Sequence, residues 1–272
     1  MKRTITKLML ASVALVVGIA FMPPDAAAKK PAPDPVVNCD AGDSLQVALD
    51  NAKLREPFSI YVSGNCTDGP FHIHQDVRVI GSPVATLSAP AGGHNVVSIV
   101  DGSSAELTDL AVDASDQVVG IQVAFNSTAV MRNVMVAGAS EPAINVADGS
   151  YAWVANSELY GNGTGLQVTQ AASAAMNDSS VHDNDFGVAT MVFSNVSLDG
   201  NTIVNNTLIG VVAASGGTYG NVTLRGTPNT IESNGTDVYC DVGGLLSADQ
   251  LQSSTTGSIG IDPDCRVFGE IF

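Results

Sequence analysis

The sequence predicts an all-β protein in which short strands wind into one solenoid of stacked coils. Three observations predict it. Segments of similar pattern recur about every 22 residues, glycine and small polar turn residues are spread throughout, and the four cysteines lie in two pairs near the ends of the repetitive part. Long apolar stripes with a helical period of 3.6 residues are missing from the repetitive part.

The repeat is clearest in four segments where an aliphatic residue precedes an asparagine by three positions. They end at Asn162, Asn184, Asn206 and Asn234, so the first two steps are equal and the last is longer. A glycine followed by an aliphatic residue recurs at a similar spacing at Gly120, Gly165, Gly187 and Gly210, and Ala143-Ile144 fills the place between the first two. One such unit cannot bury its apolar side alone, so neighbouring units must stack around a shared core. Three short strands and three turns fit this length, and the leucine framework of leucine-rich repeats is missing.

The N-terminus has the features of a secretory signal peptide. Lys2 and Arg3 precede an apolar run over residues 8–22, and residues 26–28 are three alanines. The run is shorter than the roughly 20 residues that a membrane span needs. We therefore expect a signal peptide over 1–28, a flexible Pro-rich segment over 29–36 and a β-helix domain over 37–272. A retained N-terminal anchor is the alternative, and no membrane span is expected after cleavage.

The charge limits the partners of the protein. The full chain has a formal net charge of −16, which becomes about −18 once Lys2, Arg3, Lys7 and Asp25 leave with the signal peptide. Such a surface repels phosphate backbones, so no nucleic-acid partner is expected. It favours solubility and attraction to divalent cations. The protein is expected to be secreted or periplasmic.

The four cysteines indicate disulfides, since an exported protein folds in an oxidising compartment. Three pairings are possible, and free thiols or a zinc site are alternatives that no CxxC spacing supports. The favoured pairing joins Cys39 to Cys66 and Cys240 to Cys265. Each bond would close a loop of about 25 residues and contribute about 3 kcal/mol.

The opening of the repetitive part supports a family resemblance. Val37-Asn-Cys39, a segment from Ser44 to Ala52 and a strand-like segment from Ile60 to Cys66 resemble the first coil of exported right-handed parallel β-helix proteins, the pectin-lyase-like superfamily. The resemblance covers roughly Val37 to Phe268 and implies a single-stranded right-handed parallel β-helix with a short N-terminal capping helix.

Within that fold we expect seven to eight coils. Ser44 would cap the helix, whose apolar stripe is formed by Leu45, Ala48, Leu49 and Ala52. Residues 245–251 are expected to cover the other end. The inward residues are expected to include Val97, Ile99, Ile121, Val123, Ile144, Val146, Leu166, Val168, Val188, Val211, Val222 and Leu224.

The segment Val181-His-Asp-Asn-Asp-Phe-Gly-Val188 is a candidate catalytic site. In register with the repeat, Asn184, Asp183 and Asp185 occupy turn positions, which favours a solvated corner. The alternative follows from the resemblance, because lyases and epimerases of this fold abstract a proton beside a neutralised carboxylate. His182 would then be the base, and Ca²⁺ would be held by Asp178, Asp183, Asp185 and Asp199. Arg132 and Arg225 are weaker candidates for the base.

Two further clusters have both a functional and an ordinary structural interpretation. Trp153 and Tyr151 are candidates for a sugar-stacking surface, although a lone tryptophan is more often packed in a core. His72 and His74 lie on one face of a predicted strand and would hold zinc or copper if His94 or Asp76 joined them. Two exposed histidines on the first coil are the favoured interpretation of that pair.

Three functions remain open from the sequence. The favoured one is an exported, non-catalytic module that binds a polysaccharide or a surface, because the chain is short and shows no convergent charged cleft. A polysaccharide (uronan) lyase or epimerase is the first alternative, and a structural or adhesive module is the second. The oligomeric state is left open.

Overall fold

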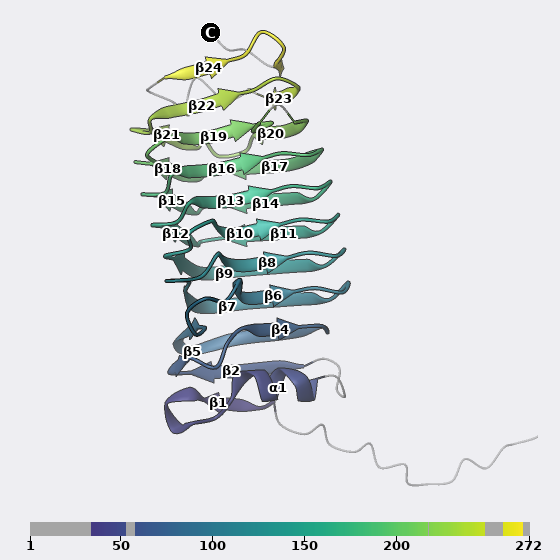
Figure 1. The fold of residues 1–272 in the computed structure, drawn as a ribbon, viewed down its shortest axis with the longest axis vertical. Helices are drawn as coiled ribbons and strands as arrows, with labels where there is room; N and C mark the ends of the chain where they lie inside the picture. Colours follow the sequence, from purple (N-terminus) through teal and green to yellow (C-terminus); the bar gives the residue numbers. More distant parts are fainter. Residues whose placement is uncertain (1–33, 53–57, 217, 248–257, 269–272) are drawn as a thin grey trace, which may run out of the picture. The chain divides into compact units, whose positions relative to one another are not determined.

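The computed structural model describes residues 34–52, 58–216, 218–247 and 258–268. The predicted signal peptide and most of the Pro-rich segment lie outside this part. The described residues form a right-handed parallel β-solenoid of about nine turns with one short helix near the start (Figure 1). The predicted fold class is confirmed. No helix of the described residues has the length and apolar character needed to cross a membrane.

The strands form two sheets within the described residues. The path along the long sheet runs through β1 (Val36–Asn38), β2 (Ser59–Ser63), β5 (Val77–Ser88), β7 (Ser104–Asp113), β9 (Thr128–Ala137), β11 (Tyr151–Ala155), β14 (Ser173–Asn177), β17 (Ser194–Asp199), β20 (Gly220–Leu224), β23 (Gly244–Ser247) and β25 (Arg266–Phe268). A side branch of the same sheet contains β3 (Asn65–Cys66), β12 (Glu158–Tyr160), β15 (Ser180–His182), β18 (Thr202–Val204) and β21 (Thr230–Glu232).

The second sheet faces the first across the core. Its order is β4 (Phe71–Ile73), β6 (Asn95–Ile99), β8 (Val119–Val123), β10 (Pro142–Val146), β13 (Thr164–Val168), β16 (Phe186–Thr190), β19 (Ile209–Ala213), β22 (Thr236–Cys240) and β24 (Ile259–Ile261). All pairs within both sheets are parallel and join residues of successive coils, as Ile144 with Leu166 and Leu166 with Val188.

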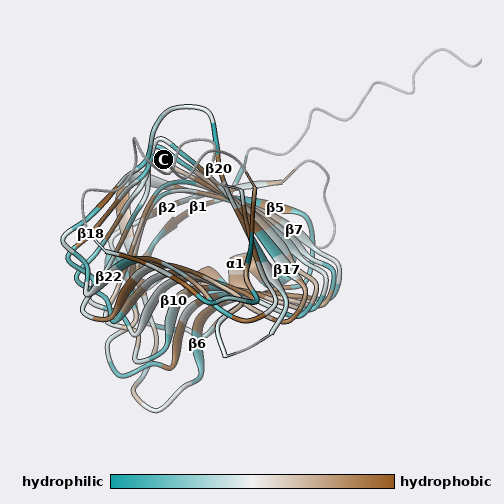
Figure 2. Ribbon diagram, turned by 90° about the horizontal axis from the view of Figure 1, so that it is seen from above, coloured by the Kyte–Doolittle hydropathy of each residue, from teal (hydrophilic) through white to brown (hydrophobic). Residues whose placement is uncertain are grey.

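The core is a continuous apolar column that runs through the coils. Alternate residues of each strand point inward, as expected for a period of two. All twelve predicted inward residues are buried, with exposures of 1% or less. Seen along the stack, apolar segments surround a shared interior (Figure 2). The prediction of a single repetitive core is confirmed.

The predicted capping helix is α1 (Leu45–Ala52), which follows a short 3₁₀ turn over Cys39–Ala41. The Ser44 hydroxyl accepts a hydrogen bond from the Val47 N–H at 3.1 Å, as an N-cap should. Leu45, Leu49 and Ala52 are buried against the first coils. The helix covers the end of the column, which would otherwise expose apolar surface.

The solenoid has more turns than the predicted seven to eight because its first coils do not follow the repeat. Ile60 pairs with Val79, which makes a step shorter than the repeat, and Val79 pairs with Leu107, which makes a longer one. From β9 to β17 the coils are regular, and paired positions such as Met131, Val154 and Met176 follow one another at nearly constant spacing. The constant period is therefore present in the middle of the fold and absent from its beginning.

The stacked asparagines form a continuous hydrogen-bonded ladder. The Nδ2 of Asn162 donates to Oδ1 of Asn184 at 3.0 Å, Asn184 donates to Asn206 at 3.0 Å, and Asn206 donates to Asn234 at 2.9 Å. The longer last step in the sequence therefore leaves the ladder intact. The additional residues are accommodated in the turns that precede β20 and β21, where the strand pairing is kept (Val196 with Val222, Ile203 with Ile231).

Both favoured disulfides are present. Cys39 bonds to Cys66 at the first coil, and Cys240 bonds to Cys265 at the last. The C-terminal segment differs in part from its predicted capping role. Residues 244–247 form strand β23, which pairs with β20 and β25, because Leu246 continues the inward column. The rest of that predicted cap, residues 248–251, lies outside the described residues.

Candidate functional site

The outward face of the long sheet carries the predicted aromatic pair. In β11, Ala152 and Val154 are fully buried, so Tyr151 and Trp153 point away from the core. Tyr151 is 41% exposed, and Trp153 is partly covered. The structure therefore places both residues where a ligand on the surface of the sheet can reach them.

Trp153 is held by its neighbours on adjacent coils. The guanidinium carbon of Arg132, on β9, lies 4.6 Å from the centre of the indole ring, which is a cation–π contact. On the other side, the indole N–H donates to Oδ1 of Asn177 on β14 at 2.9 Å. These contacts fix the orientation of the ring. One part of its surface is occupied by the guanidinium, which is a constraint that the sequence did not indicate.

The basic residues next to Trp153 are joined by one carboxylate. Glu106, on β7, binds Nε of Arg78 at 3.0 Å through Oε2 and binds Nη1 of Arg132 through Oε1. Arg78 is on β5, so the cluster spans β5, β7, β9 and β11 in sequence. Two positive charges share one negative charge, which leaves the cluster with a net positive charge on a strongly acidic protein.

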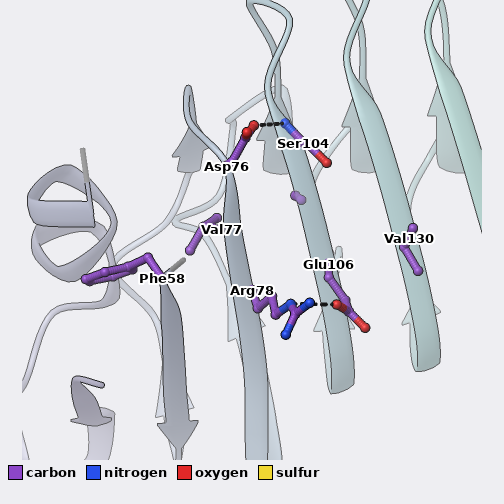
Figure 3. Close-up of a pocket in the computed structure, with 8 residues that line it drawn as sticks. Phe58, Asp76, Val77, Arg78, Ser104, Glu106 and Val130 are labelled. Carbon is purple, nitrogen blue, oxygen red and sulfur yellow. Dashed lines mark hydrogen bonds and ion pairs between the residues drawn. The ribbon is translucent and has the colours of Figure 1, made fainter. Parts of the chain in front are cut away.

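A hollow of about 520 Å³ lies beside this cluster. Arg78 and Glu106 form one side of it, Phe58 and Val130 contribute apolar surface, and Asp76 accepts a hydrogen bond from the Ser104 N–H at 2.9 Å (Figure 3). Its lining combines the polar side chains of Arg78 and Glu106 with the buried residues Phe58, Val77 and Ala105. We call the arginines 78 and 132, Glu106, Trp153 and Tyr151 the β11 surface.

The predicted catalytic segment lies on a different strip of the surface. His182 ends β15 and pairs with Tyr160 of β12, as the repeat predicted. Its Nδ1 lies 2.7 Å from Oδ2 of Asp183, and its Nε2 lies 3.0 Å from Oε1 of Glu158. The imidazole also stacks on the Tyr160 ring, with centroids 5.4 Å apart and an interplanar angle of 5°. His182 is therefore clamped between two carboxylates.

The clamp changes the acidity of the imidazole. Burial alone lowers the pKa of His182, but the hydrogen bonds to Asp183 and Glu158, together with the charges of both carboxylates, outweigh it. The net effect raises the pKa of His182 above its ordinary value of 6.5. The arrangement stabilises the protonated ring and orients the imidazole between two hydrogen-bond partners, which suits a residue that exchanges a proton.

The four predicted calcium ligands lie in two pairs. Asp178 follows β14 and Asp199 ends β17, both shortly before the β12–β15–β18 strip, and the Asp178 N–H donates to the Asp199 carbonyl at 3.0 Å. Asp183 and Asp185 follow β15 at its other end, about 10 Å further along the strand. In the part of the chain that the structure describes, no group of three or more His, Cys, Asp or Glu side chains is arranged to hold a metal ion.

The predicted histidine pair is present on the first coils. His72 and His74 have ring centroids 6.0 Å apart, and Nδ1 of His74 lies 2.8 Å from Oδ2 of Asp101. Asp76, one of the two proposed third ligands, instead accepts the Ser104 N–H. His94, the other, lies just before β6, where its carbonyl accepts the Val119 N–H at 2.8 Å.

The two arginines considered as alternative catalytic bases, Arg132 and Arg225, lie far apart in the sheet. Arg225 lies just after β20 and is exposed, four strands from Arg132 in the sheet order. The two arginines therefore do not act on one substrate group.

Two residues of these clusters were missed by the sequence interpretation. Glu106 links the two arginines, and Glu158 contacts His182 from the preceding coil. Glu158 pairs with Ser180 in the register, so its contact with His182 is diagonal, two residues along the neighbouring strand. The aligned repeat contained this signal, because outward residues one coil apart and two positions along are neighbours.

The chain belongs to the right-handed β-helix family. A family model described as "Right handed beta helix region" matches residues 95–254, which is more than half of the chain. No curated protein matches the sequence.

Two solved structures share this fold. The structure of pectate lyase Pel9A superposes with a TM-score of 0.55 at 10% identity, covering 86% of this chain and 78% of that one. Alginate lyase from Paenibacillus sp. str. FPU-7 superposes with a TM-score of 0.51 at 14% identity, covering 87% of this chain and 98% of that one. At such low identity the likeness shows the fold alone.

Proposed function

We propose that this is an exported, non-catalytic β-helix protein that binds polysaccharide through the β11 surface. The observation that carries the proposal is the contact of Arg132 with both Trp153 and Glu106, which organises residues of adjacent coils into one outward cluster. Export is supported by two disulfides, which form and persist in oxidising compartments.

The chemistry of the β11 surface suits a sugar chain. The exposed Tyr151 ring offers an apolar face, and the edge of the Trp153 indole is held in a fixed orientation by Asn177. Arg78 and Arg132 supply several N–H donors for hydroxyl or carboxylate oxygens. A surface of this kind is open along the sheet, so an extended chain can pass over successive coils. Both solved structures described above are named as lyases of pectate or alginate, which supports a polysaccharide as the ligand.

The second candidate function is a polysaccharide lyase or epimerase that uses His182. The contacts of His182 with Asp183 and Glu158 favour an acid–base role for this residue. The two carboxylates raise the pKa of His182, so at a given pH a larger fraction of the ring is protonated than in an unpaired histidine. We prefer the binding function because the β11 surface brings aromatic and basic side chains of adjacent coils into direct contact. A Ca²⁺ requirement would belong to this second candidate.

The test is a binding and turnover screen of the purified protein on a polysaccharide panel, with and without Ca²⁺. We expect binding without product, and weaker binding for Trp153→Ala and Arg132→Gln, by about tenfold each. Phe268→Ala is the matched control, because Phe268 is an exposed aromatic residue on the same sheet at β25, five strands beyond β11 in the sheet order. Unsaturated products that absorb in the ultraviolet and disappear in His182→Ala would replace the proposal with the lyase function.

A further inference from the structure

In addition to the side-chain asparagine ladder, a series of backbone hydrogen bonds joins the turns that lead from the second sheet to the long sheet. In five successive coils, the turn places two consecutive residues at left-handed φ angles between 53° and 73°: Asp101–Gly102, Phe125–Asn126, Asp148–Gly149, Gln170–Ala171 and Val192–Phe193. In the first four, the N–H of the second residue donates to the carbonyl of the first residue in the next coil, at 2.9–3.0 Å. The fifth, Phe193, donates to the Tyr219 carbonyl. We call this series the left-handed corner.

At Val192–Phe193, both residues of the pair are unsuited to the left-handed backbone of this corner. Asp–Gly pairs adopt two consecutive left-handed conformations readily, because glycine lacks a Cβ and aspartate tolerates this region. Val192 is β-branched and Phe193 is bulky, and such residues are genuine outliers at φ of 53° and 61°. Phe125 alone has a similar φ of 57° in its pair, so the Val192–Phe193 step is distinguished by two such residues in succession, which is a reason to look for a function of its side chains.

Phe193 and Tyr219 form an exposed aromatic stack at this step. Their ring centroids are 5.1 Å apart with an interplanar angle of 18°, and the residues are 65% and 61% exposed. Tyr219 is covered on its far side, because a Cβ added to Gly243 would lie only 3.3 Å from the Tyr219 ring. At the equivalent position one coil before Phe193 stands Ala171, whose side chain is a single methyl group. The stack is therefore bordered by Gly243 at the Tyr219 end, and at the Phe193 end the preceding coil carries only the short side chain of Ala171.

The surroundings of the Phe193 ring define the kind of ligand. Gln170, exposed beside Ala171, offers an amide that can donate and accept hydrogen bonds. The charged residues of the turns in this corner are aspartates, namely Asp101, Asp148 and Asp241, and these turns contain no lysine or arginine in the sequence. An anionic ligand would be repelled here, in contrast to the β11 surface. An apolar ring face next to neutral polar groups matches a neutral sugar, which has apolar C–H faces and hydroxyl edges.

We propose that the Phe193–Tyr219 stack is a second binding site, at which a neutral saccharide ring packs on Phe193 over Ala171. The site is separate from the β11 surface, rests on different residues and does not depend on the function proposed there. The two sites together would distinguish the charged from the neutral sugars of a mixed polysaccharide.

The test is isothermal titration calorimetry of the purified protein with neutral oligosaccharides of glucose, mannose and xylose. Oligogalacturonate is the charged comparison. The principal variant combines Val192→Asp with Phe193→Gly, which reproduces the Asp148–Gly149 step of the same corner. We expect this variant to lose affinity for the neutral ligand by about tenfold or more, while its melting temperature stays equal or rises. Phe193→Trp should retain binding.

Phe125→Asp is the matched control, because Phe125 is an exposed aromatic residue on the same corner, three coils earlier, with a φ of 57°. It should leave affinity for the neutral ligand unchanged. The proposal is overturned if no neutral oligosaccharide binds at millimolar concentration, or if the double variant binds as well as the unaltered protein. It is also overturned if sedimentation shows self-association that the double variant loses, since the stack would then pair two copies of the chain.

The same titrations separate the two proposals. If Trp153→Ala and Arg132→Gln leave all binding unchanged while the double variant loses neutral binding, only the β11 proposal fails. If oligogalacturonate binding depends on Trp153 and the double variant behaves as the unaltered protein, only the second site fails.

Discussion

The side-chain amide of Asn234 donates to Oδ1 of Asp237 at 3.0 Å, and this contact ends the asparagine ladder. The Asn234 backbone N–H donates to the same oxygen at 3.1 Å. Asp237 is 1% exposed, and its Oδ2 has no hydrogen-bond partner among the described residues. Four amides in succession thus donate toward a buried carboxyl group.

Two substitutions of Asp237 distinguish the roles of its two carboxyl oxygens. Asp237→Asn keeps the accepting Oδ1 and replaces the unpartnered oxygen, so we expect the free energy of unfolding to be unchanged or to rise. Asp237→Ala leaves the Asn234 donors without an acceptor and should cost about 1–3 kcal/mol. Urea denaturation of both variants tests this. Equal destabilisation in both would show that the carboxylate charge itself is required.

Gly187 should not tolerate a side chain. A methyl group there would overlap the carbonyl oxygen of Gly210 in the next coil and lie 2.8 Å from Cγ2 of Ile203. We expect Gly187→Ala to lower the free energy of unfolding by about 1–3 kcal/mol, because the coils would have to separate locally. The matched control is Gly161→Ala, since Gly161 has no atom within 4 Å of an added Cβ. Gly161 has a φ of 64°, so its cost should come from backbone strain alone and be smaller, about 1 kcal/mol.

His182 should make stability depend on pH. Its pKa is raised in the folded protein, so its contribution is fully present below pH 6.5 and is lost as pH rises through the folded-state pKa. We expect His182→Gln to reduce the difference in unfolding free energy between pH 5.5 and pH 8.5. Denaturation curves at both values measure it. If the variant and the unaltered protein show the same difference, the clamp by Asp183 and Glu158 does not hold a proton.

Loss of the second disulfide should weaken the last coil. Cys240 is buried and its partner, Cys265, lies 25 residues further along the chain. We expect Cys240→Ser with Cys265→Ser to cost about 3 kcal/mol and to increase proteolysis near the C-terminus. Limited proteolysis followed by mass spectrometry locates the cleavage. Cleavage confined to residues before 200 would contradict this expectation.

The sequence predicted the fold well because a solenoid repeats its own register. Asn162, Asn184 and Asn206 occupy equivalent positions in successive coils, so their alignment in the sequence is also their alignment in space. The inward residues follow from the same alignment. The first coil was predicted from its resemblance to other β-helix proteins and not from the period, because the step from Ile60 to Val79 and the step from Val79 to Leu107 differ from each other and from the regular repeat.

The candidate sites were less predictable because they depend on side chains that meet diagonally or around a corner. Glu158 reaches His182 across two positions, and Glu106 bridges Arg78 and Arg132, which do not share a column. The Phe193–Tyr219 stack depends on two turns of different length, which a fixed period does not place opposite each other. Pattern alone locates strands, whereas these contacts require the geometry of the coil.

The longer turns before β20 and β21 have a consequence for how such a protein diversifies. They add residues between Asn206 and Asn234 while the hydrogen bond between the two side chains remains 2.9 Å long. Insertions and deletions in these turns therefore leave the stacking of the coils unchanged. A designer could graft recognition loops at these two turns of the scaffold, and lineages could exchange ligand specificity there, without repacking the interior.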